Sequence, residues 1–193
     1  MKVLELFSGT ESFSKVARDR GHQTFTVDKE KKFNPNLTKD LWDVELGDIP
    51  FKPDVIWASP PCTHFSIATH RYWANRKPSI QSMQSFNLIL RTLSLIMRLN
   101  PRFWILENPK SRLRWLLGNP PNTVYYGSYD HPVLKPTDLW GFYPEMNFPP
   151  KPKMKSFWSY DIPRDSKSRG IVPRKLCEHI IKILEKNIKK GLK

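Results

Sequence analysis

The beginning of the chain combines short apolar runs with one stretch of helical spacing. Residues 3–7 (VLELF) are apolar up to the pair Ser8-Gly9, which predicts a buried strand followed by a tight turn. Residues 12–20 place their apolar side chains on one side of a helix, whereas residues 23–28 (QTFTVD) alternate as a strand does. A strand, a turn, a helix and a strand in this order predict the start of a parallel sheet.

Two more short apolar runs and one irregular region follow. Residues 55–58 (VIWA) and 103–106 (FWIL) predict buried strands, because each run is short, apolar and bounded by turn residues. Between residues 118 and 173, prolines and aromatic residues are dense and no period is maintained, which indicates short strands and loops. Parallel strands that alternate with helices place the chain in the α/β class, with a mostly parallel sheet and flanking helices.

Two helices complete the predicted elements. Residues 79–99 carry apolar side chains at helical spacing, and Pro101 lies just beyond the expected end. Residues 173–187 are amphipathic with proline at the first turn, which predicts a closing helix packed on the core. The apolar residues that recur at helical spacing in the first of these helices are Met83, Phe86, Leu90, Leu93 and Met97.

Charge narrows the classes of partner. Lys and Arg number 32 against 18 Asp and Glu, a formal net charge of +14 over 193 residues. A field of this size attracts phosphates, so nucleic acid is the first expected partner and an anionic membrane surface the second. No apolar run reaches the ~18 residues of a membrane-spanning helix, and the N-terminus lacks the pattern of a signal peptide.

The cysteine content and the length set further limits. Cys62 and Cys177 are too few for a disulfide framework or a four-cysteine zinc site, so we expect no structural metal. A length of 193 residues with 39% hydrophobic residues fits one domain with one core. We therefore expect a cytoplasmic protein of a prokaryote or of a virus-infected host cell, with no membrane association.

Special residues follow three of the predicted strands. These are Ser8-Gly9, Pro60-Pro61-Cys62 and Glu107-Asn108. Ligands of open parallel sheets bind beyond the carboxyl ends of the strands, so we expect the three segments to meet at one edge of the sheet. Asp28 ends the next strand, 19 positions after Gly9, which is a spacing at which an acid can reach the hydroxyls of a ribose.

Cys62 and Glu107 are the candidate reactive residues. Two prolines fix the chain direction before Cys62, and an accessible thiolate is a suitable nucleophile for a soft electrophilic carbon. Glu107 follows a strongly apolar strand, and a partly desolvated carboxyl there is suited to donate or share a proton. Cys177 lies beside the apolar face of the closing helix, and we interpret it as a structural residue.

These segments resemble the motifs of the cytosine-5 DNA methyltransferase family, in particular of its short, phage-type members. Pro-Pro-Cys followed by Glu-Asn is specific in combination, because each motif has a separate chemical task. The resemblance extends over most of the chain, in the order that the family has. The matching segments are residues 6–9, 40–41, 59–62 with 65–66, 107–109, 129–140 and 170–176.

The resemblance implies a fold and its division. The fold would be the Rossmann-like fold of S-adenosylmethionine-dependent methyltransferases, with a reduced target-recognition region, in a single domain spanning residues 1–193. Residues 1–117 would form the cofactor-binding and catalytic core. Residues 118–170 would be a basic, Pro- and aromatic-rich substrate-recognition segment, and residues 171–193 a closing helix packed on the core.

The resemblance also implies a reaction. Cys62 would add to C6 of cytosine and Glu107 would hydrogen-bond or protonate N3, so that C5 accepts the methyl group of S-adenosylmethionine. The base must leave the duplex stack, or the DNA must be single-stranded. The cofactor would contact Phe7, Ser8, Gly9, Thr10, Asp28, Asp40, Leu41 and Pro60, and the substrate would contact Ser66, Arg71, Asn108, Lys135 and Thr137.

Three departures from the family pattern leave alternatives open. The turn after the first strand has one glycine and carries Glu11. In the matching segment of residues 129–140, Lys135 stands in place of the arginine of the family's motif. The recognition segment is short and basic, with interspersed aromatic residues. We expect short or no sequence specificity. The alternatives are a catalytically weak DNA-binding protein that keeps the fold and needs a partner to act, and an RNA cytosine methyltransferase, because the same chemistry works on a flipped RNA base. A protein partner that provides specificity is also left open.

Overall fold

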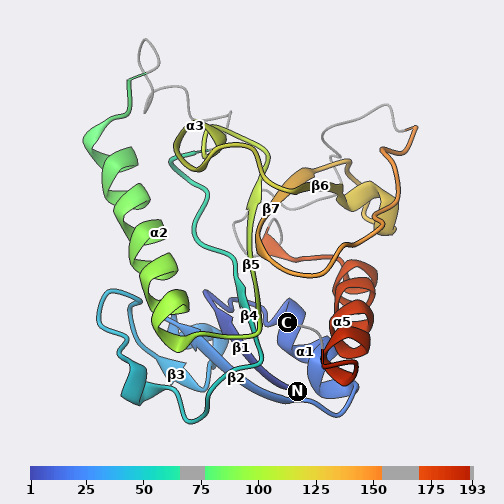
Figure 1. Cartoon of the computed structure of the whole chain (residues 1–193). Helices are drawn as coiled ribbons and strands as arrows, with labels where there is room; N and C mark the ends of the chain where they lie inside the picture. Colours follow the sequence, from blue (N-terminus) through green and yellow to red (C-terminus); the bar gives the residue numbers. More distant parts are fainter. Residues whose placement is uncertain (66–76, 154–169, 192–193) are drawn as a thin grey trace.

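A twisted sheet with helices on both faces forms the centre of the computed structural model, which describes residues 1–65, 77–153 and 170–191 (Figure 1). The sheet has seven strands in the order β3-β2-β1-β4-β5-β7-β6. The strands are β1 (Lys2–Leu6), β2 (Gln23–Asp28), β3 (Leu37–Thr38), β4 (Val55–Ala58), β5 (Phe103–Pro109), β6 (Asn122–Tyr125) and β7 (Pro136–Phe142). The helices are α1 (Ser12–Asp19), α2 (Ile80–Leu99), α3 (Arg114–Leu117) and α5 (Arg174–Lys189), with 3-10 turns η1 (Lys31–Phe33), η2 (Leu46–Asp48) and η5 (Tyr126–Tyr129).

The direction of the strands confirms the predicted α/β class. β1, β2, β3, β4 and β5 pair in parallel, and β7 runs antiparallel to both β5 and β6. The order of the strands reverses between β1 and β4, so the carboxyl ends of these two strands form the crevice where ligands bind in open α/β sheets.

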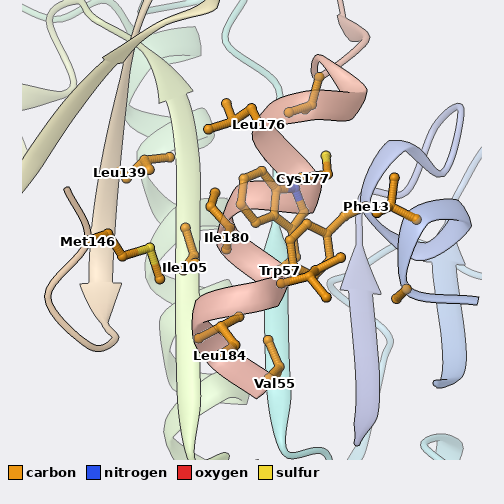
Figure 2. Close-up of a cluster of buried hydrophobic side chains, with 14 of the residues drawn as sticks. Phe13, Val55, Trp57, Ile105, Leu139, Met146, Leu176, Cys177, Ile180 and Leu184 are labelled. Atoms are coloured by element: carbon orange, nitrogen blue, oxygen red, sulfur yellow. The ribbon is translucent and has the colours of Figure 1, made fainter. Parts of the chain in front are cut away.

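Alternating side chains of the parallel strands form a core on each face of the sheet. Val3, Val55 and Trp57 contribute to the face covered by α1 and α5, where Phe13 of α1 stacks on Trp57 with ring centroids 4.6 Å apart (Figures 1 and 2). Leu4 and Ile56, one residue further along, point to the opposite face, which α2 covers. These strands are therefore buried on both sides, as expected for strands that read as continuous apolar runs.

The predicted helices are confirmed, with small changes at their ends. α1 ends at Asp19, before Gly21 with its positive φ of 79°. α2 begins after Ser79, whose hydroxyl accepts a hydrogen bond from the backbone N–H of Ser82, and α5 begins directly after Pro173. None of the helices in the described ranges is both long and apolar enough to cross a membrane.

The side of α2 that is buried is not the side that carries its most regular row of apolar residues. Met83, Leu90 and Met97 recur every seven residues, yet they are exposed. The buried side chains of α2 include small polar residues next to branched apolar ones. They are Ser82, Ile89, Thr92, Leu95, Ile96 and Leu99.

Strand β5 is longer than the apolar run predicted. The strand was expected to end at Leu106, but it continues through Glu107 and Asn108 to Pro109. The physical reason is its pairing with β7, because the antiparallel ladder runs on to Pro109 opposite Thr137. Glu107 and Asn108 are thus held in a strand and not in the loop that follows it.

The Pro- and aromatic-rich segment contributes to the sheet itself. β6 and β7 lie within the predicted recognition segment of residues 118–170, and they form the sheet's last two positions. Gly141 in β7 has a φ of 151°, and a Cβ there would lie 2.1 Å from the backbone oxygen of Trp104 in β5. The recognition role of the segment stays a prediction.

Candidate active site

The carboxyl ends of β1, β4 and β5 lie side by side, which confirms the predicted meeting of the three motif segments. After β4, the backbone N–H of Ser59 donates to the carbonyl of Leu6 at 3.3 Å. Asn108 at the end of β5 donates from Nδ2 to the carbonyl of Pro60 at 2.9 Å. A fully buried side chain therefore ties the loop before Cys62 to the strand that carries Glu107.

The turn after β1 is held by the next parallel strand. Phe7 and Gly9 both have left-handed backbone conformations, with φ of 57° and 46°. The N–H of Ser8 donates to the carbonyl of Val27 at 3.1 Å, and that of Gly9 donates to Oδ2 of Asp28 at 2.8 Å. Asp28 is thereby fixed beside the turn, as the spacing predicted.

Two features of this turn fit a ligand with polar groups. The hydroxyl of Ser8 is buried and has no hydrogen-bond partner among the described residues. A Cβ built on Gly9 would meet no atom within 4 Å, so the space above the turn is open. An unpaired buried hydroxyl is costly unless a ligand or water satisfies it.

Glu11, the departure from the glycine-rich pattern, is held by two side-chain contacts. Its carboxylate pairs with Arg18 of α1 and accepts a hydrogen bond from the hydroxyl of Thr26 in β2 at 3.2 Å. Glu11 also has a positive φ of 56°, a conformation that favours glycine. The two side-chain contacts neutralise and hold the acid where related turns use a second glycine.

Glu5 is a buried acid that the sequence pattern did not indicate. It lies in β1, is 3% exposed, and accepts hydrogen bonds from the N–H groups of Phe13 and Ser14 in the first turn of α1, at 3.3 and 2.7 Å. Burial raises the pKa of Glu5 to about 7, although these hydrogen bonds act in the opposite direction. The strand and the helix that flank the turn are therefore joined by one carboxyl group.

The other predicted cofactor residues lie around the same turn. The N–H of Lys39 donates to the carbonyl of Asp28 at 3.0 Å, which places Asp40 next to the end of β2. Asp40 accepts from the N–H of Trp42 through Oδ1, while Leu41 is buried in the core under α2. Thr10 is within hydrogen-bond distance of Ser12, 3.2 Å between the hydroxyl oxygens.

The segment just before α5, which is part of the matching segment of residues 170–176, approaches the turn after β1. The N–H of Val172 donates to the hydroxyl of Ser12 at 3.2 Å. Val172 lies just before α5, and its side chain is part of the core shared by α1 and α5. Residues from distant parts of the sequence thus meet beside the turn after β1.

The loop that carries Cys62 begins from a buried support. Pro60 is buried, whereas Cys62 is half-buried and is not in a disulfide. The N–H of Phe65 donates to the carbonyl of Cys62 at 3.0 Å, and the Phe65 ring is fully buried. The backbone on both sides of Cys62 is therefore anchored.

Glu107 and Asn108 point to opposite faces of the sheet. Glu107 is 6% exposed and lies on the face of α1 and α5, where its Oε1 accepts a hydrogen bond of 3.0 Å from the phenol of Tyr126 in η5. Asn108 lies on the face of α2, and its Oδ1 is buried without a hydrogen-bond partner in the described part of the chain. The phenol of Tyr126 therefore contacts Glu107 and not Asn108.

The remaining predicted substrate residues follow η5 at the start of β7. The Nζ of Lys135 lies 4.4 Å from the ring centroid of Tyr126, and Thr137 is buried opposite Pro109 of β5. The N–H of Lys110 donates to the carbonyl of Pro136 at 2.9 Å, which extends the contact beyond the strand end. Lys135 and Thr137 are thereby placed beside the end of β5.

A buried ion pair fixes the layer under this region. Asp138 has no exposed side-chain surface and pairs through both carboxylate oxygens with Arg114 of α3, each at 2.6 Å. The hydroxyl of Thr123 in β6 also donates to Asp138 at 2.8 Å. The pair and its Thr123 contact join α3, β6 and β7 next to the carboxyl end of β5.

Some sequence predictions lie outside the described residues, while Cys177 can be placed. Ser66, Arg71 and most of the basic and aromatic residues of segments 70–77 and 151–169 are among the undescribed ones. Cys177 is fully buried in the core of α5 and the sheet, which agrees with the structural role expected (Figure 2).

Comparison with known proteins agrees with this geometry. Residues 1–114, from β1 to the start of α3, match the family model described as C-5 cytosine-specific DNA methylase. A protein of Frog virus 3 (isolate Goorha) named "Probable DNA (cytosine-5)-methyltransferase" is 32% identical over 160 residues, which are 75% of this chain and 74% of the viral protein.

The chain belongs to the C-5 cytosine-specific DNA methylase family.

The fold of a solved methylase agrees with this assignment. A mutant of Spodoptera frugiperda DNMT2 aligns with a TM-score of 0.50 and 20% identity over 72% of this chain and 48% of that one. The chain therefore spans about half the length of this solved structure. The family and the fold class predicted from the sequence are both confirmed.

Two residues of this methylase domain that the motifs did not indicate are Glu5 and Tyr126. Glu5 stands in an apolar run. The buried apolar residues before and after it in the sequence were a signal that could have indicated a buried acid. Tyr126 lies in a stretch without a period, and its contact with Glu107 depends on how β7 folds back against β5. No local pattern announces such a contact.

Proposed function

We propose that the chain is a DNA (cytosine-5)-methyltransferase that uses S-adenosylmethionine, with Cys62 as the nucleophile and Glu107 as the acid. The observation that carries the proposal is the hydrogen bond from Asn108 to the carbonyl of Pro60 at 2.9 Å. It joins the loop that carries Cys62 to the strand that carries the buried Glu107. Both residues therefore lie at the carboxyl ends of neighbouring strands, β4 and β5, where ligands of open α/β sheets bind.

The reaction begins at C6 of the cytosine ring. The thiolate of Cys62 forms a bond to C6, and the electron pair of the C5=C6 bond is displaced through C4 to N3. Glu107 gives its proton to N3, which keeps negative charge from building up on the ring and makes C5 nucleophilic. Once C5 is methylated, its proton leaves to water, the C5=C6 bond re-forms, the thiolate is expelled and N3 returns its proton to Glu107.

S-adenosylmethionine supplies, when bound, a methyl group on a sulfonium centre that a nucleophilic carbon can attack. The open turn after β1 and the unpaired hydroxyl of Ser8 are the features that support its binding there. Asp28 would hold the ribose, Asp40 the adenine amino group, and Phe7 would pack on the adenine. Ser8, Gly9, Thr10, Leu41 and Pro60 would line the rest of the cofactor site.

The net charge of +14 supports DNA as the substrate, because lysine and arginine side chains release counterions from phosphates. C5 and C6 are stacked in a duplex, so the target base must be flipped out or presented in a single strand. Ser66, Arg71, Asn108, Lys135 and Thr137 are the proposed substrate residues. Recognition by the short segment between residues 118 and 170 would extend over few bases.

The test is methyl transfer from labelled S-adenosylmethionine to duplex DNA, single-stranded DNA and RNA of the same sequence. We expect label in DNA, at C5 of cytosine, with bisulfite sequencing giving the local context. Label in RNA alone would replace DNA by RNA as the substrate. Absence of transfer to every polymer, with intact binding to DNA, would favour a DNA-binding protein that needs a partner and would contradict the proposal.

A further inference from the structure

Glu107 has a buried partner that the reaction described above does not use. The phenol of Tyr126 donates a hydrogen bond of 3.0 Å to Oε1 of Glu107, and Tyr126 has no exposed surface. We propose that Tyr126 is a positioning residue that fixes Oε1 of Glu107 as the acceptor, so that the transferable proton is carried by Oε2. This inference rests on the proposed function, because it assigns the orientation of the acid in that reaction.

The phenol remains a donor across the working pH range. Burial raises the pKa of Tyr126 well above its usual range, and the nearby Glu107 carboxylate raises it further. Oε1 already accepts the phenolic proton, so a protonated Glu107 that keeps this bond carries its own proton on Oε2. A carboxyl without such a partner could carry its proton on either oxygen. In half of those arrangements the proton would be on the oxygen that does not face the base.

The ring of Tyr126 is fixed from several sides. Lys135 places its Nζ 4.4 Å from the ring centroid, and His131 meets the ring edge-on with centroids 5.5 Å apart. Tyr126 belongs to the same buried core as Leu139, the residue paired with Glu107 across the β5–β7 ladder. Because the ring cannot turn aside, its hydroxyl holds the carboxyl in one orientation.

The bond strengthens as the reaction proceeds. When Oε2 gives its proton to N3 of the cytosine, Glu107 becomes a carboxylate and the bond from Tyr126 becomes charge-assisted. An interaction that is stronger in the transition state than in the ground state accelerates the chemical step. Loss of the hydroxyl should therefore lower the rate of transfer and leave the affinity for the cofactor almost unchanged.

Tyr126→Phe tests this, because it removes the hydroxyl and keeps the ring. Tyr143→Phe is the control, since Tyr143 donates a partly buried hydrogen bond to the carbonyl of Leu139 at 2.8 Å, without reaching Glu107. We expect Tyr126→Phe to slow single-turnover methyl transfer by roughly ten- to a hundredfold, as for loss of a hydrogen bond to a charged group. Tyr143→Phe should stay within about threefold of the unmodified protein.

A double-mutant cycle with Glu107→Gln separates positioning from folding. In the Glu107→Gln background no charge develops at residue 107, so Tyr126→Phe should change the rate by no more than about threefold. Equal slowing by the two tyrosine variants, or the same loss from Tyr126→Phe in both backgrounds, would overturn the positioning role. Absence of transfer by the unmodified protein on DNA and RNA would instead overturn the proposed function, so the two failures are distinguishable. Melting temperatures and the S-adenosylmethionine Kd are measured alongside, and both should be preserved.

Discussion

Two regions near the carboxyl ends of the strands are stabilised by different kinds of hydrogen bond. In the first-strand region, residues 5–28, carboxylates accept hydrogen bonds mainly from backbone N–H groups, as Asp28 does from Gly9 and Glu5 from Ser14. In the Glu107 region, residues 107–138, side chains meet side chains, as Tyr126 meets Glu107 and Arg114 meets Asp138. A backbone donor persists whatever side chain its residue carries, so the first-strand region depends on fewer residue identities.

The difference suggests a division of roles. The first-strand region can change its residues and keep its turn, whereas the Glu107 region loses an interaction with each substitution. Changes in the first should therefore alter cofactor affinity, and changes in the second should alter the chemical rate or the stability of the domain. Four substitutions examine this contrast.

The largest effect is expected at Cys62, which follows β4, the strand between β1 and β5. Cys62→Ala removes the atom that bonds to C6, and loss of a nucleophile lowers the rate of transfer by about a thousandfold or more. DNA binding and the S-adenosylmethionine Kd should be retained. Cys177→Ala, in the core, is the control and should keep the transfer rate. Unchanged turnover of Cys62→Ala would remove the nucleophile assignment.

The buried ion pair of the Glu107 region should show the next largest effect. Asp138→Ala leaves Arg114 and Thr123 without their shared acceptor, and breaking such a buried pair lowers the free energy of unfolding by about 4 kcal/mol. Urea denaturation measures the change. Arg174→Ala, which breaks exposed pairs with Asp19 and Glu178, is the control and should cost about 0.5 kcal/mol. Similar losses in both variants would contradict the contrast between the regions.

Glu5 in the first-strand region should make stability depend on pH. Its pKa is raised from 4.5 to about 7 in the folded state, so its stabilising contribution is complete below about pH 4.5 and is lost as the pH rises through 7. Relative to the unmodified protein, Glu5→Gln should gain about 3 kcal/mol in unfolding free energy between pH 4.5 and pH 8. Parallel stability curves for the two proteins, from urea denaturation at each pH, would exclude a raised pKa.

The smallest effect is expected for Asp28→Ala. The turn after β1 keeps its bond from Ser8 to Val27, so the fold should persist while one contact with the cofactor ribose is lost. We expect the S-adenosylmethionine KM to rise about tenfold, as for one hydrogen bond to a charged group, with kcat at saturation nearly unchanged. A fall in kcat with an unchanged KM would reverse the roles assigned to the two regions.

The sequence allowed prediction of the parallel part of the fold, because its signals are local. The alternating pattern of residues 23–28 spans β2, and the apolar run of residues 55–58 spans β4. Turn residues follow each of them directly. The motif segments at the ends of β1, β4 and β5 met as expected, since parallel neighbours end at the same edge. Cys62 and Glu107 could be selected for the same reason.

What escaped prediction depends on contacts between distant segments. The extension of β5 to Pro109 follows from its ladder with β7, and the apolar row of Met83, Leu90 and Met97 on α2 proved to be exposed. The hydrogen bond from Asn108 to the carbonyl of Pro60, 48 positions earlier, was not indicated by any local pattern. The partner of Glu107 comes from η5, in a stretch whose composition indicated loops. Such contacts are set by the path of the chain in space.

Gly141 shows how far from the opening a mutation can act. Any side chain there would have to displace the Trp104 peptide, three residues before Glu107 on the same strand. A saturation scan that measures the stability of the fold should therefore find this position almost invariant, whereas at Gly9, with empty space above it, the fold should tolerate asparagine. Sequence drift in this family would then be constrained at a site that no substrate touches.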